Sequence, residues 1–461
     1  LGGDPEAAAT SYSIDSRTLA PGGLFVALRA ERDGHDFVLD ALDRGAVGAL
    51  VARPVEGAGL IVVEDTATAL SALGRTARDR LDGAPVVGIT GSTGKTSTKD
   101  LTAAALAPAG PVGASPVSFN NEIGVPLTLL SAPEAAAAVV VEMGARGIGH
   151  IATLCEVARP TVGVITNIGL AHAEFFGSRE EVARGKGELL EALPAAGHAV
   201  LCADDDLTPR LRARTGAAVL TAGRSAAADV RVSGMQLDAE LRPAFRLDTP
   251  WGPADVAPLP VRGAHQAVNA AMAVAVAAVC GVALADAVAG LAGAVGSPLR
   301  MDLRRTPGGV AVLDDSYNAN PTSMAAAVEA LAALGGSGRR FAVLGPMAEL
   351  GPEAAEAHRR LGRLAAEARI DTVVAVAPAR TGGPAGGPLR EAVEALAAGA
   401  REGGVTAVVV DGPAGALAEL GARLRPGDAV LVKASRVAGL ERVAAALHEP
   451  RRPVPQPEAA R

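Results

Sequence analysis

The sequence of 461 residues is poor in aromatic residues, which make up 2% of it, and it contains only three cysteines. Cys155, Cys202 and Cys280 lie far apart and none belongs to a CxxC pair. An odd number of widely spaced cysteines argues against a disulfide framework. We therefore expect three small, buried thiols in a reducing cytoplasm.

Long apolar runs and clusters of basic residues are also missing. Charged residues, Gly or Pro interrupt each apolar stretch before it reaches the length of a membrane span, and no signal peptide opens the sequence. The formal net charge is −7 and the basic residues are scattered, so no nucleic-acid partner is expected. We expect a cytoplasmic monomer without membrane insertion.

Strand-like and helix-like segments alternate along most of the chain, which is typical of parallel α/β domains. The length predicts two to three domains. We place a small N-terminal α/β domain at residues 1–83, a central P-loop-type α/β domain at 84–299 and a C-terminal Rossmann-like α/β domain at 300–448. The first residue is Leu1, so the first domain is expected to be truncated at its start. The Pro-rich stretch 449–461 is expected to be a disordered tail.

The sharpest local motif lies between the predicted strand Val86–Thr90 and a predicted helix. Glycine there lets backbone N–H groups surround phosphate oxygens, a lysine neutralises their charge, and a threonine hydroxyl can bind Mg²⁺. The match to GxxxxGK[ST] is imperfect, because Ile89 occupies the position of the first glycine. A glycine-rich turn with an incidental lysine is the alternative. The motif predicts a nucleoside triphosphate and consists of Gly91, Ser92, Thr93, Gly94, Lys95 and Thr96.

Two further candidates follow predicted strands of the same block. Glu142 ends the strand Ala138–Glu142, and His172 follows the strand Val162–Thr166. The carboxyl ends of parallel strands face the ligand crevice of such sheets, where a carboxylate can bind Mg²⁺. A solvated acid and a structural histidine are the alternatives.

Lys186 is the most informative residue for the mechanism. It lies within the apolar stripe of the predicted helix Ser178–Leu193, for which Ser178 is a candidate N-cap. Gly185 and Gly187 flank it, although each costs about 1 kcal/mol relative to Ala inside a helix. Bare backbone on both sides indicates close approach to another group. Burial would lower the pKa of the amine and allow it to form a carbamate with CO₂; a snorkelling, charged lysine is the alternative.

Polar residues at the border of the second and third blocks form another candidate site. In the predicted helix His265–Cys280, His265 and Asn269 share one face, and an amide can bind a base edge; a capping or surface role is the alternative. Arg300 and Asp314 lie where a domain seam is expected and suit a triphosphate and a ribose. The loop that follows indicates ligand contact or an Asx-rich helix cap, and it includes Tyr317, Asn318 and Asn320.

These motifs occur in one order that resembles the Mur ligases of bacterial cell-wall synthesis. The set comprises GSTGKT, Glu142 followed by Met-Gly-Ala, TNIGLAH, KGE around Lys186, the GxHxxxN helix and DSYNANP. The segment Ile14-Asp15-Ser16-Arg17 is similar to the start of that family's uridine-recognition domain. DSYNANP favours the branch that adds D-alanyl-D-alanine.

The resemblance implies an ATP-dependent ligase that joins D-alanyl-D-alanine to a UDP-N-acetylmuramoyl-tripeptide through an acyl phosphate. It implies ATP and two Mg²⁺ ions, with Thr96, Glu142, His172 and a CO₂-derived carbamate on Lys186 as metal ligands. Lys95, Lys186 and His172 would be catalytic. Asn269 would contact adenine, and Arg300 and Asp314 the phosphates and ribose. Ser16 and Arg17 would hold the uridine part, and Tyr317, Asn318 and Asn320 would lie near the amine substrate.

Three residues depart from the family pattern: Gln266 replaces Asn, His150 replaces Glu and Pro346 replaces Asp. Two alternatives remain open from the sequence. One is a related ligase that adds diaminopimelate or lysine, although the DNPR segment expected there is absent. The other is a nucleotide-binding protein without catalytic activity.

Overall fold

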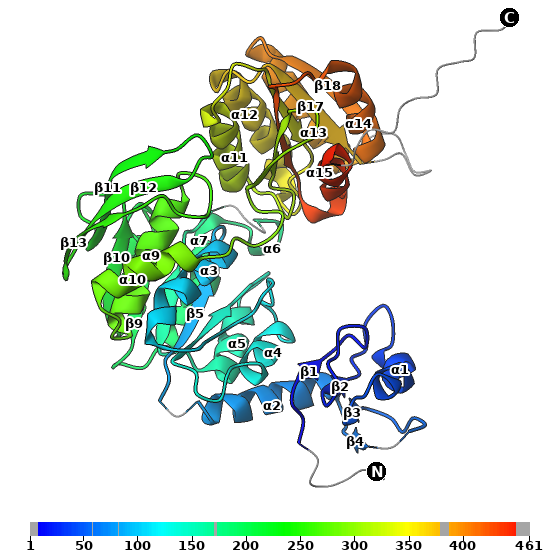
Figure 1. Ribbon diagram of the computed structural model, residues 1–461, viewed down its shortest axis with the longest axis vertical. Helices are drawn as coiled ribbons and strands as arrows, with labels where there is room; N and C mark the ends of the chain where they lie inside the picture. The colour runs from blue at the N-terminus through cyan, green and yellow to red at the C-terminus, as the bar shows by residue number, and fades with distance from the viewer. Residues whose placement is uncertain (1–7, 58, 82, 170–172, 379–386, 449–461) are drawn as a thin grey trace, which may run out of the picture.

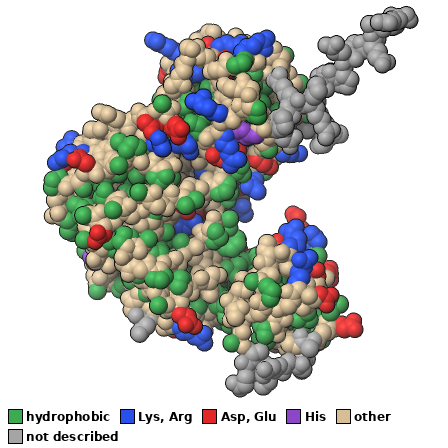
Figure 2. Space-filling view, in the orientation of Figure 1, with side chains coloured by type: hydrophobic (Ala, Val, Ile, Leu, Met, Phe, Trp, Pro, Cys, Tyr) green, Lys and Arg blue, Asp and Glu red, His purple; other side chains and the backbone are tan. Residues whose placement is uncertain are grey.

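The computed structural model describes residues 8–57, 59–81, 83–169, 173–378 and 387–448, which fold into three α/β units (Figure 1). The units follow one another along the chain, and the central one lies between the other two (Figure 1). The space-filling view shows a wide opening between the N-terminal and C-terminal units (Figure 2). Within the described ranges, no helix is long and apolar enough to span a membrane.

The N-terminal unit contains four short parallel strands in the order β1-β2-β3-β4. Their alternate buried side chains pack on the helices η1 and α1, with Phe25, Val38 and Ala49 in the core. The bounds are β1 Tyr12–Ser13, β2 Leu24–Val26, η1 Gly34–Phe37, α1 Val38–Asp43, β3 Gly48–Val51 and β4 Leu60–Val62.

Helix α2 (Thr66–Asp79) connects the first unit to the second. The Asp65 side chain caps it by accepting from the Thr68 N–H at 2.7 Å. Leu70 packs with strand residues of the N-terminal sheet and with Leu127 of α4 (Gly124–Leu130). Arg78 Nε donates to the carbonyl of Ala158 at 2.9 Å. Helix α2 therefore contacts both units and fixes the approach of the first unit to the second.

The central unit is built on a nine-stranded sheet in the order β13-β12-β11-β10-β9-β8-β5-β7-β6. The seven strands from β11 to β6 in this order pair in parallel with one another. Strands β12 and β13 extend the sheet beyond β11 through antiparallel pairs. The bounds are β5 Val86–Thr90, β6 Val112–Ala114, β7 Ala138–Glu142, β8 Val162–Ile165, β9 His198–Cys202, β10 Ala218–Gly223, β11 Val230–Leu237, β12 Pro243–Thr249 and β13 Gly252–Val256.

Helices cover both faces of the central sheet, because its strands bury side chains on both sides. Val87 and Ile89 of β5 belong to the core shared with α3 and α9, whereas Val86 belongs to the opposite core. Helix α9 is buried along most of its length, so its small Ala and Val side chains suit close packing against α3. The helices of this unit are α3 Lys95–Leu106, η2 Ala107–Ala109, α5 His150–Ala158, α6 Ala173–Phe176, α7 Arg179–Glu191, α8 Thr208–Arg212, α9 Gln266–Val279, α10 Leu284–Gly290 and η3 Leu291–Gly293.

The C-terminal unit has six strands in the order β14-β15-β19-β16-β17-β18. All neighbouring pairs are parallel except β14 with β15. The strands are β14 Asp302–Arg305, β15 Ala311–Asp314, β16 Arg340–Leu344, β17 Thr372–Ala377, β18 Thr406–Asp411 and β19 Ala429–Lys433. The helices are α11 Pro321–Ala333, η4 Gly351–Glu353, α12 Ala354–Glu367, α13 Pro388–Glu402, α14 Gly412–Arg423, η5 Arg436–Ala438 and α15 Glu441–His448.

Candidate functional site

The phosphate-binding motif forms the turn between β5 and α3. Gly94 caps α3 with φ of 79°, a left-handed conformation that favours glycine. Lys95 Nζ donates to the carbonyl of Gly91 at 2.8 Å, so the side chain folds back over the turn. Burial lowers the pKa of Lys95, which nearby Glu142 opposes and nearby Arg300 reinforces. The turn therefore presents a partly buried cation at the N-terminus of a helix, where phosphate groups bind.

Residues after β8 hold this turn from the neighbouring strand. Asn167 Oδ1 accepts from the Thr93 N–H at 3.0 Å, and Asn167 Nδ2 donates to Thr93 Oγ1 at 2.7 Å. Ser92 Oγ accepts from the Gly169 N–H at 2.8 Å. Asn167 was not predicted as a site residue, although it directly follows the predicted strand Val162–Thr166 of the same sheet.

Glu142 and Thr96 meet at the carboxyl edge of the sheet. Strand β7 pairs with β5 so that Glu142 lies opposite Ile89. Thr96 Oγ1 donates to Glu142 Oε2 at 2.7 Å, and Asn120 Nδ2 donates to Glu142 Oε1 at 2.8 Å. Glu142 is buried, with 2% of its surface exposed. The first turn of α3 and the end of β7 thus bring Thr96 and Glu142, the two residues predicted as metal ligands, into direct contact.

Arg300 reaches the same corner from the border of the C-terminal unit. Its Nη2 donates to Thr96 Oγ1 at 2.9 Å and to Ser118 Oγ at 3.3 Å. The guanidinium lies 4.2 Å from the ring centroid of Tyr317, a cation–π arrangement. Arg300 therefore lies beside Thr96 of the phosphate-binding motif, and its contact with a phosphate stays a prediction.

Lys186 is buried on α7, with 1% of its surface exposed. The Ser178 side chain caps this helix by accepting from the Glu181 N–H, as predicted. Burial, and then the positive charge of Lys95, hold the pKa of Lys186 well below its ordinary value. The lysine thus lies within electrostatic reach of the phosphate loop and does not extend into solvent.

The oxygen donors at this corner suit Mg²⁺, a hard cation that binds one or two carboxylates and completes its shell with water and substrate phosphates. In the part of the chain that the structure describes, no group of three or more His, Cys, Asp or Glu residues could hold a metal by itself. Thr96 and Glu142 supply a hydroxyl and a carboxylate side by side. His172, the remaining predicted ligand, lies outside the described residues.

Asn269 lies against the phosphate loop. A Cβ atom on Gly94 would be 3.0 Å from Asn269 Oδ1. Asn269 Nδ2 donates to Gln266 Oε1 at 2.9 Å, and Gln266 Nε2 donates to Ser97 Oγ at 3.4 Å. Gln266, one of the departures from the family pattern, therefore orients the amide of Asn269.

The loop after β15 carries the remaining C-terminal candidates. Burial raises the pKa of Asp314, whose carboxylate accepts from the Ser316 N–H at 3.0 Å. Asn320 caps α11 and accepts from the Ser323 N–H at 3.0 Å, and its Nδ2 lies 3.5 Å from the Ser92 carbonyl. The Asx-rich cap weighed as an alternative is therefore present, together with a contact to the phosphate loop.

Lys433 anchors this loop and was not identified from the sequence. It forms an ion pair with Asp315 and donates to the carbonyl of Asn318 at 2.9 Å. Lys433 ends the buried strand β19, which is the only sequence signal for its role. Tyr317 is held separately, since its N–H donates to the carbonyl of Leu299 at 3.1 Å.

Ser16 and Arg17 lie on the connection between β1 and β2, in the N-terminal unit, which Figure 1 shows apart from the phosphate loop of the central unit. Ser16 is buried. Arg17 is mostly exposed and pairs with Asp15 at 2.7 Å, which lowers the pKa of Asp15 to about 2. The structure therefore does not bring Ser16 and Arg17 close to the phosphate-binding motif. A substrate that contacts both this pair and the motif must extend from the N-terminal unit to the central unit.

Comparisons with known proteins agree with this geometry. The profile of the Mur ligase middle domain matches residues 89–277, and that of the Mur ligase, glutamate ligase domain matches residues 299–436. The UDP-N-acetylmuramoyl-tripeptide–D-alanyl-D-alanine ligase of Mycobacterium tuberculosis (strain CDC 1551 / Oshkosh) is 44% identical, over 95% of this chain and 92% of its own length.

Solved structures support the same relationship. MurF from Acinetobacter baumannii superposes with a TM-score of 0.82 at 32% identity, covering 97% of this chain and 95% of its own. MurF ligase from Thermotoga maritima in complex with ADP superposes with a TM-score of 0.75 at 30% identity, covering 95% of this chain and 97% of its own. The chain therefore belongs to the Mur ligase family, in the group of the UDP-N-acetylmuramoyl-tripeptide–D-alanyl-D-alanine ligases.

Proposed function

We propose that this enzyme uses ATP to join D-alanyl-D-alanine to UDP-N-acetylmuramoyl-tripeptide in peptidoglycan precursor synthesis. The observation that carries the proposal is the corner where Lys95, Thr96, Glu142 and Arg300 meet beside the buried Lys186. Cationic groups, a carboxylate and a helix N-terminus at one point suit a phosphoryl group that is transferred between two anions.

The three units divide the substrates among them. Residues 1–83 with Ser16 and Arg17 would hold the uridine part, residues 84–299 would bind ATP, and residues 300–448 would bind the dipeptide. The loop that carries Tyr317, Asn318 and Asn320 supports this division, because it borders the phosphate loop. The substrates are small molecules, and we propose the cytoplasm as the location, where ATP is available.

In the first step the terminal carboxylate of the tripeptide attacks the γ-phosphate of ATP, which gives an acyl phosphate and ADP. Lys95 and Arg300 offset the repulsion between the two anions and hold the transferring group in line. In the second step the amine of the dipeptide attacks the acyl carbon and phosphate leaves. Exclusion of water by closure of the units would prevent hydrolysis of the acyl phosphate.

Thr96 and Glu142 would hold Mg²⁺, which supplies charge neutralisation on the phosphate oxygens when bound. A second ion near Lys186, His172 and a carbamate on Lys186 belong to the same proposal. The burial of Lys186 supports the carbamate, since a lowered pKa leaves the amine free to react with CO₂.

A phosphate-release assay tests the function by omission. We expect release only when ATP, the tripeptide nucleotide and D-alanyl-D-alanine are all present, and one new peptide product by mass. Phosphate release that does not depend on D-alanyl-D-alanine would refute the assignment. So would a faster reaction when the tripeptide nucleotide is replaced by the corresponding UDP-linked dipeptide and D-alanyl-D-alanine by a free diamino acid. Mass spectrometry of the intact protein in bicarbonate, with Lys186→Ala as the blank, tests the carbamate: absence of the added 44 Da despite activity would exclude it.

A further inference from the structure

The turn of α7 that carries Lys186 is held from outside the catalytic corner. Its neighbour Glu188 accepts from the Ala152 N–H at 3.0 Å and from the Gly149 N–H, at the start of α5. Lys186 itself is buried. Arg214, which follows α8 in the chain, contacts the turn at its carbonyls. The position of Lys186 therefore depends on contacts made by residues on either side of it.

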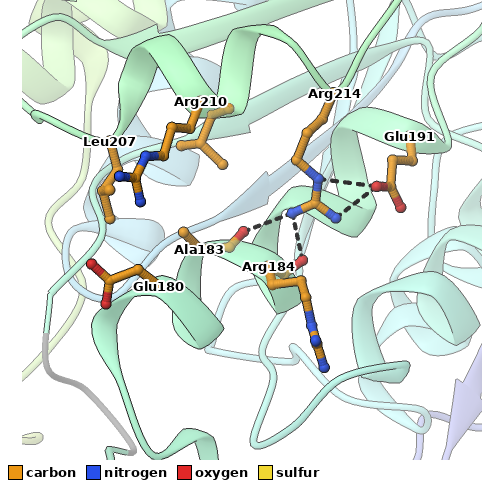
Figure 3. A pocket seen from close by; sticks show the side chains of 8 residues that line it. Glu180, Ala183, Arg184, Glu191, Leu207, Arg210 and Arg214 are labelled. Atoms are coloured by element: carbon orange, nitrogen blue, oxygen red, sulfur yellow. Dashed lines mark hydrogen bonds and ion pairs between the residues drawn. The ribbon is translucent and has the colours of Figure 1, made fainter.

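Arg214 makes an unusual contact for a surface arginine. Its Nη1 donates to the carbonyl of Ala183 at 2.9 Å and to that of Arg184 at 2.7 Å (Figure 3). These carbonyls belong to the turn immediately before Lys186, and a carbonyl can accept a second donor besides its helical partner. Nε and Nη2 of Arg214 donate to Glu191 Oε1 at 3.0 and 2.7 Å, so the guanidinium contacts α7 both before Lys186 and at the end of the helix.

Gly187 is what admits the guanidinium. A Cβ atom on Gly187 would lie 2.0 Å from Arg214 Nη1 and 2.5 Å from its Cζ, and no other side chain is as close. Arg214 is partly buried, with 22% of its side chain exposed, beside a shallow pocket of about 330 Å³ between α7 and α8 (Figure 3). A helical glycine is destabilising by itself, so the cost of this one is offset by the arginine that it admits.

We propose that Arg214, through Gly187, is a positioning residue for Lys186 in the ligase reaction. Nη1 of its guanidinium fixes the carbonyls of the preceding turn and thereby the direction in which Lys186 leaves the helix. The inference rests on the proposed function, in which Lys186 takes part in phosphoryl transfer. Arg214 touches neither substrate nor metal; it acts through the helix.

A double-mutant cycle in the full chain tests the proposal. Arg214→Ala should lower kcat about 10- to 100-fold, as loss of a supporting contact around a metal-site ligand does, with the KM values of all three substrates unchanged. Gly187→Ala should lower kcat similarly, because its methyl group expels the guanidinium. In the double variant the second substitution should cost nothing further, since the clash is gone. Arg214→Lys should restore part of the rate.

The control is Glu191→Gln, which removes an exposed charge but keeps a side-chain oxygen that can accept from Arg214, and it leaves the carbonyl contacts; its kcat should equal that of the unaltered enzyme. Each variant is assayed well below its melting temperature. Unchanged kcat in folded Arg214→Ala, or losses that add in the double variant, would overturn the inference. Lys186→Ala separates the two proposals: an active Lys186→Ala enzyme refutes the role of Lys186 itself, whereas an inactive one beside a fully active Arg214→Ala enzyme refutes the positioning role alone.

Discussion

Replacing Lys186 by Met should stabilise the protein while it abolishes ligase activity. Burial and the positive charge of Lys95 hold the pKa of Lys186 well below its ordinary value. An amine in that environment costs folding free energy, because the unfolded chain solvates the ammonium freely. Methionine has a similar length and no charge, so it fills the same space without that cost.

The size and pH dependence follow from linkage. Each unit by which folding lowers a pKa costs about 1.4 kcal/mol at pH values below the lowered pKa. Between the lowered pKa and about 10.4 the unfolded state binds more protons than the folded state, so the stability of the unaltered protein rises with pH across that window. We expect Lys186→Met to gain on the order of 1 kcal/mol at neutral pH. That is roughly 2–4 °C in the melting temperature of a domain of 150–250 residues.

Differential scanning calorimetry of the nucleotide-free protein in CO₂-depleted buffer measures the change. Lys99→Met is the matched control, because Lys99 is equally buried but pairs with Asp100 at 2.8 Å and donates to the carbonyl of Ser115. Its removal leaves a carboxylate without its partner and should lower the melting temperature. If Lys186→Met lowers it as much as Lys99→Met does, the buried amine stabilises the fold and the reasoning is wrong.

Three further substitutions test the corner itself. Glu142→Gln should reduce phosphate release on the order of 100-fold or more, because it removes the charge that is proposed to hold Mg²⁺; full activity at excess Mg²⁺ would contradict a dependence of the reaction on the Glu142 charge. Arg300→Lys should lower kcat about 100-fold, since an ammonium does not reproduce a planar guanidinium that lies over Tyr317 and donates to Thr96, while ADP affinity measured by calorimetry stays nearly constant; an equal loss of ADP affinity would contradict a role specific to transfer. Gln266→Asn should raise the KM for ATP about 2- to 10-fold at unchanged kcat, the equivalent of one net hydrogen bond to Asn269; an unchanged KM would make Gln266 a packing residue.

The buried strands were the part of the fold most accessible from the sequence. The bounds of β5 and β7 agree residue by residue with the predicted strands Val86–Thr90 and Ala138–Glu142, because strands covered on both faces are continuous runs of Val, Ile, Leu and Ala. The strands β1, β6, β10 and β14 were not predicted. Strand β14 is a short edge strand with three charged residues, so it carries little hydrophobic pattern. Helix ends shifted by one or two residues, as their caps are set by local hydrogen bonds.

The contacts within the site were only partly accessible. Strand ends bring Thr96 and Glu142 together, and topology makes that predictable. Ser118 and Asn120 come from a loop without a periodic pattern, yet they bind Thr96 and Glu142. The Arg300 contact to Thr96 joins residues 204 positions apart. Such pairs depend on how the units dock, which no local pattern encodes.

The glycines that flank Lys186 predicted that another group approaches the helix, but not which group. Two glycines beside a lysine indicated close approach, and the structure identifies the approaching groups as Phe176 at Gly185 and Arg214 at Gly187. Neither group is a ligand. The two glycines therefore make room for side chains that pack on the helix, and not for a substrate. The three residues of the segment Lys186-Gly187-Glu188 each make a different contact from the same helical turn. The lysine is buried near the phosphate loop, the glycine admits an arginine from the outer side, and the glutamate binds the start of α5. A buried amine that costs stability needs such support, because the helix would otherwise relax and let the charge reach water.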